Sequence, residues 1–232
     1  HYWQKKPLLV RGAIPAFQLA ASSGFDLESP IASAELFKLS GSKNVESRLV
    51  KHSPTWSLEH GPFKEKEIPK LTDKNWTLLV QGLDLHMPAA HDLLQRFRFI
   101  PDARLDDLMI SYASDGGGVG PHLDAYDVFL IQVQGRRRWR IGPVSSPKLM
   151  PNLPLKILRQ FKPRQEWVLE PGDLLYLPPR YAHDGIAIGE CMTWSMGFRA
   201  PRQDGLAHEL LARLADRAVE ELPPTIYQDA GQ

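Results

Sequence analysis

The sequence contains a single cysteine, Cys191, among 232 residues. One thiol excludes an intramolecular disulfide framework and a thiolate zinc cluster, and we interpret Cys191 as a small buried side chain in a strand. The chain also lacks any apolar run near the roughly 18 residues that a membrane-spanning helix requires, and no segment resembles a signal peptide. We therefore expect no membrane partner and a cytoplasmic location.

The net charge of the chain is also small. The 28 basic and 27 acidic residues give a formal net charge of +1 at pH 7. This balance argues against attachment to nucleic acid by bulk electrostatics alone, and we expect no direct sequence-specific nucleic-acid binding. With 43% hydrophobic residues, the chain can bury a sizeable core, either as one large domain or as two small ones.

Short β-rich segments separated by glycine and proline dominate the sequence from Leu108 onward. Before that point, short strands mix with helices predicted over 33–39 and 88–97. Strands in series with such turns indicate an all-β sandwich or barrel rather than βαβ units, so the predicted class is mainly β with flanking helices. Strands are predicted over 108–112, 127–133, 137–141, 167–169, 174–177 and 192–198, with turns at 116–118, 135, 142–143, 171–173 and 189, and an irregular insert over 143–166.

After residue 200 the pattern becomes helical. Leu206, Leu210, Leu211 and Leu214 lie on or near one stripe of this helix. Such a stripe packs either on the chain's own barrel or on a second subunit, and the pattern does not distinguish the two. We expect a β domain over 1–200 and a helical segment over 201–232.

The most informative stretch runs from Gly116 to Asp124 and is completed by His183. His122 and Asp124 are two residues apart, which in a strand places both side chains on the same face. Two imidazoles and one carboxylate on one face of a metal leave the other positions open for substrate, as in the facial triad of non-haem Fe(II) oxygenases. The H-x-D pair alone is a weak signal, and the glycines before it are also compatible with a flexible loop.

The arginine-rich stretch 135–141 gives a sharper indication. Alternation places Arg137 on an otherwise apolar face with Trp139 and Ile141. Because burying an unpaired charge is costly, Arg137 should have an anionic partner. The partner is either a protein carboxylate or a carboxylate-bearing cosubstrate that the guanidinium binds bidentately. Arg136, Arg138 and Arg140 lie on the opposite face. We expect this face to be solvated or, alternatively, to contact the RNA backbone.

Taken together, these motifs resemble the JmjC/cupin-type ribosomal oxygenases, which depend on 2-oxoglutarate, and in particular their bacterial arginine hydroxylases. The resemblance spans almost the whole chain. The segments that carry it are 3–7, 60–63, 121–124, 126–129, 135–140, 170–173, 177–183 and 197–201.

This resemblance implies a double-stranded β-helix, or jelly-roll, that binds Fe(II) through His122, Asp124 and His183, with 2-oxoglutarate and O2 as cosubstrates. Arg137 matches the basic residue that binds the distal carboxylate of 2-oxoglutarate. The implied reaction hydroxylates an arginine side chain of a large-subunit ribosomal protein. Alternatives are a histidine or asparagine target, lysine demethylation, or a non-catalytic cupin that binds metal or a carboxylate.

Further expectations concern weaker candidates and the assembly. Ser195 could hydrogen-bond a cosubstrate if its face of the last strand looks into the barrel, although packing hydroxyls are commoner. A cationic target would need clamps at the pocket mouth, for which Asp115, Tyr126 and Asp184 are candidates by proximity to the ligands. The family's dimer is built from helices after the core, so we expect a homodimer through 201–222. Its C-terminal winged-helix domain is expected to be absent here.

Overall fold

The computed structural model describes residues 1–16 and 31–222. His1–Arg199 form one compact unit and Ala200–Gln232 another, and each is described by itself. Strands dominate the first unit, which confirms the predicted mainly-β class. The strands are β1 (Leu8–Val10), β2 (Ser47–His52), β3 (Trp56–His60), β4 (Trp76–Val80), β5 (Leu105–Ala113), β6 (Asp127–Pro143), β7 (Gln165–Leu169), β8 (Leu174–Leu177) and β9 (Tyr181–Phe198). The helices are α2 (Ser33–Ser40), α3 (Pro88–Gln95) and, in the second unit, α4 (Gln203–Glu221), with short 3-10 turns η1 (Glu65–Glu67), η2 (Leu83–Leu85) and η3 (Asp102–Arg104).

The strands form one antiparallel sheet in the order β1-β8-β6-β9-β5-β4-β2-β3, with β7 paired to β6. The two long central strands, β6 and β9, pair along almost their whole length, from Asp127 opposite Phe198 to Pro143 opposite Tyr181. Of the helices in the described residues, none has the length and apolar character of a membrane span.

The turn predicted at Gly135 was wrong. The strands predicted on its two sides are one continuous strand, β6, whose register against β9 shifts between Gln132 and Arg136. Gly135 has a φ of 60°, and a Cβ there would lie 2.1 Å from the carbonyl oxygen of Glu190. A left-handed glycine with no room for a side chain is typical of a β-bulge. The bulge bends β6 and reverses which side chains face each side.

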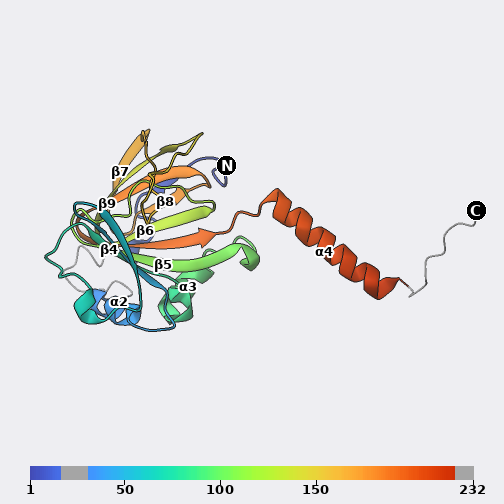
Figure 1. The fold of residues 1–232 in the computed structure, drawn as a ribbon, viewed down its shortest axis with the longest axis horizontal. Coiled ribbons are helices and arrows are strands. Elements are labelled where there is room, and N and C mark those ends of the chain that lie inside the picture. Colours follow the sequence, from blue (N-terminus) through green and yellow to red (C-terminus); the bar gives the residue numbers. More distant parts are fainter. Residues whose placement is uncertain (17–30, 223–232) are drawn as a thin grey trace, which may run out of the picture. The chain divides into compact units, whose positions relative to one another are not determined.

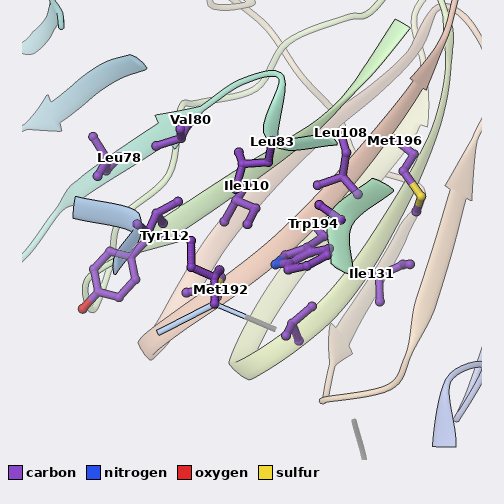
Figure 2. Close-up of a cluster of buried hydrophobic side chains, with 14 of the residues drawn as sticks. Leu78, Val80, Leu83, Leu108, Ile110, Tyr112, Ile131, Met192, Trp194 and Met196 are labelled. Atoms are coloured by element: carbon purple, nitrogen blue, oxygen red, sulfur yellow. The ribbon is translucent and has the colours of Figure 1, made fainter. Parts of the chain in front are cut away.

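Two hydrophobic clusters lie on opposite faces of the bent sheet. The larger one is covered by α2 and α3, which lie on the side of β4 and β5 (Figure 1), and several of its members are shown in Figure 2. The second cluster contains Leu130, Trp139 and Ile141 and lines the inner face of the sheet.

Strand register assigns the candidate residues to this inner face. Leu130 is opposite Ser195, and Ile141 is opposite His183. Since residues directly opposite each other in a sheet point to the same side, His183 and Ser195 share the inner face with Arg137. Ser195 therefore faces inward, as a hydrogen bond to a cosubstrate in the barrel would require.

Candidate metal and cosubstrate site

Two histidines and one aspartate converge on the inner face. His122, Asp124 and His183 each offer one ligand atom, and these atoms lie within 4.8 Å of one another. The Asp124 Oδ2 atom is 3.9 Å from His122 Nε2 and 3.4 Å from His183 Nε2. The side chain of His183 is buried, whereas those of His122 and Asp124 are 25% and 26% exposed. The group is thus anchored in the barrel and open on one side.

The chain approaches the triad along the edge of β9 rather than through a regular strand. His122 pairs with His183 as an isolated bridge, and Asp124 lies outside any strand, so the two side chains converge without the regular strand on which the i, i+2 argument was based. The glycine-rich segment instead follows β9 by backbone hydrogen bonds. A Cβ on Gly118 would lie 2.5 Å from the carbonyl oxygen of Gly185. Only glycine permits this close approach.

The imidazole rings are oriented by backbone carbonyls. His122 Nδ1 lies 2.9 Å from the carbonyl oxygen of Gly120, and His183 Nδ1 lies 3.0 Å from that of Tyr181. If each Nδ1 donates its proton to the carbonyl, each Nε2 keeps a free lone pair, which is the tautomer a metal ligand needs. Burial lowers the pKa of His183 to about 4, with a further lowering from His122 and an opposing effect of Asp124. The His183 ring is therefore neutral near pH 7.

Arg137 lies deeper on the same face. It is 3% exposed, its Nη1 donates to Ser111 Oγ at 2.9 Å, and its Nε lies 3.4 Å from Cys191 Sγ. Within residues 1–16 and 31–222, no carboxylate forms an ion pair with it, and its Nη2 has no hydrogen-bond partner. The predicted inward, buried position is confirmed, and a protein carboxylate as its partner is not observed. A buried guanidinium with an unused donor is an anion-binding group.

Tyr126 lies near Asp124, two residues along the chain. Its side chain is partly exposed, and burial followed by the charge of Asp124 raises the pKa of its phenol. Tyr126 thus remains a candidate for substrate contact.

The other two clamp candidates lie elsewhere. Asp115 pairs with Lys74 at 2.9 Å and accepts a hydrogen bond from the Gly189 amide. Gly189 is six residues from His183 on β9, about 20 Å along the strand, so Asp115 is remote from the triad.

Asp184 directly follows His183 and therefore points to the opposite face of β9, where it forms an ion pair with Arg140. Neither Asp115 nor Asp184 can clamp a substrate at the triad.

Asp107 is a site candidate that the sequence reasoning missed. On β5 it shares a face with Met109, which is opposite the inward Ser195. Burial raises the pKa of Asp107, with an opposing effect of its hydrogen bond from the Gly82 amide. Its charge also raises the pKa of Tyr126, after the larger effects of Asp124 and Asp106, which indicates that these acidic groups lie near the phenol. The sequence offers no local signal for Asp107, because three apolar residues, 108–110, separate it from Ser111.

The fold and the donor set define a cupin-like barrel with a two-histidine, one-carboxylate metal centre. Residues 92–206 match the family model of the JmjC domain, so the chain contains a JmjC domain.

Among curated proteins, the chain is 41% identical to the "Ribosomal protein uL16 3-hydroxylase" of Escherichia coli over 98% of this chain and 58% of that protein. It is 38% identical to a "Probable ribosomal oxygenase" of Haemophilus influenzae over 88% of this chain and 49% of that protein. The chain thus spans roughly half to three fifths of these relatives.

Solved structures agree with these relatives. E. coli ycfD aligns with a TM-score of 0.81 at 39% identity, covering 99% of this chain and 58% of that one. The structure of YcfD, a ribosomal oxygenase from E. coli, in complex with cobalt and 2-oxoglutarate aligns with a TM-score of 0.77 at 38% identity, covering 99% and 57%.

Proposed function

We propose that this chain is an Fe(II)- and 2-oxoglutarate-dependent oxygenase that hydroxylates an arginine side chain of a large-subunit ribosomal protein. One observation carries the proposal: a two-histidine, one-carboxylate triad shares the inner face with a buried guanidinium that has no carboxylate partner among the described residues. Two E. coli comparisons support the proposal. One relative is named a ribosomal protein hydroxylase, and one aligned structure is a complex with cobalt and 2-oxoglutarate.

His122, Asp124 and His183 would hold the iron. Their donor set fits a facial triad, both Nδ1 atoms are within hydrogen-bond distance of carbonyls, and the exposed side of the group leaves positions for other ligands. Bound Fe(II) with 2-oxoglutarate supplies the activation of O2 that hydroxylation of an unactivated C–H bond requires. The protein residues orient the reactants and exclude water from them.

Arg137 would bind the distal carboxylate of 2-oxoglutarate. It lies four residues from Ile141, the partner of His183, which corresponds to about 13 Å along β6. A metal, a five-carbon diacid and an extended arginine side chain together can span this distance. Ser195, on the same face, would donate a hydrogen bond to the cosubstrate or to the target.

Asp107 and Tyr126 would receive the target. Desolvation raises the pKa of Asp107, and this penalty on its charge is relieved when a cation binds beside it. A cationic arginine side chain fits such a space, with its guanidinium at the carboxylate and its methylenes against Met109 and the phenol ring. A carboxylate in this position would favour a cationic arginine over a histidine or asparagine as the target.

The test is intact-mass spectrometry of ribosomal-protein peptides incubated with the chain, Fe(II) and 2-oxoglutarate. We expect a gain of one oxygen atom on an arginine, located by fragmentation, and a matching amount of succinate. Asp124→Asn should abolish both products, while Arg136→Met, on the outer face, should not. Oxygen on a histidine or asparagine would support the alternative targets, and no succinate formation would support a non-catalytic cupin.

We also propose that α4 pairs with a second copy of the chain. Leu206, Leu210, Leu211 and Leu214 lie on one side of this helix at spacings suited to helix pairing. Light scattering should show a dimer that Leu210→Glu with Leu214→Glu dissociates. A monomeric wild-type chain would exclude this assembly. Modification of a ribosomal protein would take place in the cytoplasm, which is the location we propose.

A further inference from the structure

Positive charge is concentrated in one surface segment. Residues 143–164, which we call the basic arm, contain five basic residues and no acidic residue, whereas the whole chain has a net charge of only +1. All five side chains are exposed. They are Lys148, Lys156, Arg159, Lys162 and Arg164.

These cations are not neutralised within the described parts of the chain. None of the five forms an ion pair there, although other exposed basic residues such as Lys51, Lys74 and Arg199 do. The nearest acidic residue in the sequence, Glu166, is opposite Arg140 on β6. The arm therefore presents an uncompensated positive surface, which attracts polyanions.

The arm has a defined backbone course. It contains a bridge between Leu149 and Leu158, and the Arg159 amide donates to the carbonyl of Lys148 at 2.8 Å. Ile157 and Leu158 are 2% and 3% exposed, which anchors the arm to the barrel. The backbone that carries the charges is thus anchored to the barrel.

The arm is attached directly beside the metal triad. The Leu158 amide donates to the carbonyl of Pro121 at 2.8 Å, one residue before His122. A Cβ on Gly120 would lie 3.0 Å from Ile157 Cδ1, so the two segments are in contact. The part of the arm around Leu158 therefore lies beside the metal ligands, so an anion bound there lies close to the site.

We propose that the basic arm binds the phosphate backbone of RNA that accompanies the target, so that the substrate is a ribosomal protein in contact with RNA. This inference rests on the proposed function. An arginine-containing target alone would bring positive charge to a positive rim. RNA phosphates beside the target would replace that repulsion with attraction, without any base-specific contact.

The first experiment measures RNA binding by fluorescence anisotropy, with no iron or 2-oxoglutarate present. A labelled single-stranded RNA is titrated with the chain at several salt concentrations between about 50 and 200 mM. The arm variant replaces Lys148, Lys156 and Lys162 with glutamine. The matched control replaces Lys64, Lys66 and Lys70 with glutamine, which removes the same exposed charge elsewhere.

We expect the wild-type chain to bind RNA with an affinity that falls steeply with salt. The arm variant should lose about two units of the slope of log affinity against log salt, at roughly 0.7 units per phosphate contact on single strands. The control should keep the wild-type slope. Equal slopes for all three proteins, or an equal loss in the control, would overturn the proposal.

Two further probes distinguish RNA from the other polyanions that a basic surface could bind. Tighter binding of a polyglutamate peptide than of RNA would assign the arm to an acidic protein partner. Binding of vesicles rich in anionic lipid, without RNA binding, would assign it to a membrane surface. Either result would overturn the RNA proposal.

The second experiment compares hydroxylation of a free target peptide with that of the same ribosomal protein bound to RNA. The arm variant should hydroxylate the free peptide at the wild-type rate and the RNA-bound target several-fold more slowly. Loss of activity on both substrates, or on neither, would contradict the role assigned to the arm. Failure of the oxygenase reaction itself would leave the RNA-binding result standing, so the two proposals can fail separately.

Discussion

Substitution of Arg137 distinguishes a role in 2-oxoglutarate binding from a purely structural role. Its guanidinium is buried, donates to Ser111 Oγ at 2.9 Å and leaves Nη2 without a partner among the described residues. Arg137→Met keeps much of the side-chain volume and removes the charge. If the guanidinium binds the distal carboxylate of 2-oxoglutarate, the variant loses charged hydrogen bonds worth about 1.5–3 kcal/mol. The Kd for 2-oxoglutarate should then rise about 10- to 150-fold.

The same substitution weakens ligand binding but should not lower the stability of the ligand-free protein. In the ligand-free wild-type chain, Arg137 bears the desolvation cost of a charge that has no carboxylate partner within residues 1–16 and 31–222. Methionine removes this cost and leaves Ser111 without its donor. Burying a charge without an ionic partner costs free energy, so an apolar side chain of similar volume at the same position should be neutral or stabilising. We therefore expect the free energy of unfolding of the ligand-free protein to stay the same or to increase.

Calorimetry with Co(II), the metal of the aligned E. coli complex, measures 2-oxoglutarate binding without relying on turnover. Urea unfolding of the ligand-free variant measures stability. Arg136→Met is the matched control, since Arg136 is the adjacent residue on the exposed face, and it should change neither quantity. Unchanged 2-oxoglutarate affinity in a folded Arg137→Met protein would refute the assignment. A loss of stability of about 3–5 kcal/mol would instead mean that Arg137 has a structural role.

The remaining predictions address the triad, the target pocket and the packing behind them. In the folded metal-free chain, the pKa of His183 is lowered to about 4, whereas in the unfolded chain the same imidazole takes up a proton near the ordinary pKa of 6.5. The free energy of unfolding should therefore fall as the pH drops from 6.5 toward 4, by up to about 1.4 kcal/mol per pH unit. Urea unfolding at several pH values checks this, and a His183→Asn variant with the same slope would contradict it. Asp107→Asn should raise the KM for an arginine peptide about 10-fold or more while leaving the Kd for 2-oxoglutarate unchanged, and a change in that Kd alone would remove Asp107 from the target pocket. Gly185→Ala places a Cβ 2.7 Å from the ring of Trp139 and should destabilise the fold by about 1–3 kcal/mol, whereas Gly205→Ala in α4, with nothing within 4 Å, should be neutral or stabilising.

The period-two pattern of strands explains why much of the site could be predicted from the sequence. The alternation around Arg137 is local, so its burial followed from its immediate neighbours and is confirmed, as is the buried strand position of Cys191. The grouping of His183 with the H-x-D pair was predicted from the sequence and was supported by the resemblance to a family. No local pattern connects residues so far apart in the chain.

The errors have three different physical reasons. A glycine with positive φ fits a turn or a bulge equally well, and only the partner strand β9 shows that Gly135 lies in a bulge. Proximity in sequence misled for Asp184, because the next residue on a strand points to the opposite face. Asp107 was missed because β5 reaches the site by pairing with β9, a long-range contact that no motif marks.

The central claim is that one triad and one inward guanidinium form an oxygenase site. Mass spectrometry of a ribosomal-protein peptide after incubation with Fe(II), 2-oxoglutarate and isotopically labelled O2 tests it most directly. The structure predicts that one labelled oxygen atom appears on an arginine and that Asp124→Asn prevents it. A peptide that stays unmodified while the wild-type chain binds both metal and 2-oxoglutarate, or one that gains unlabelled oxygen, would contradict the claim.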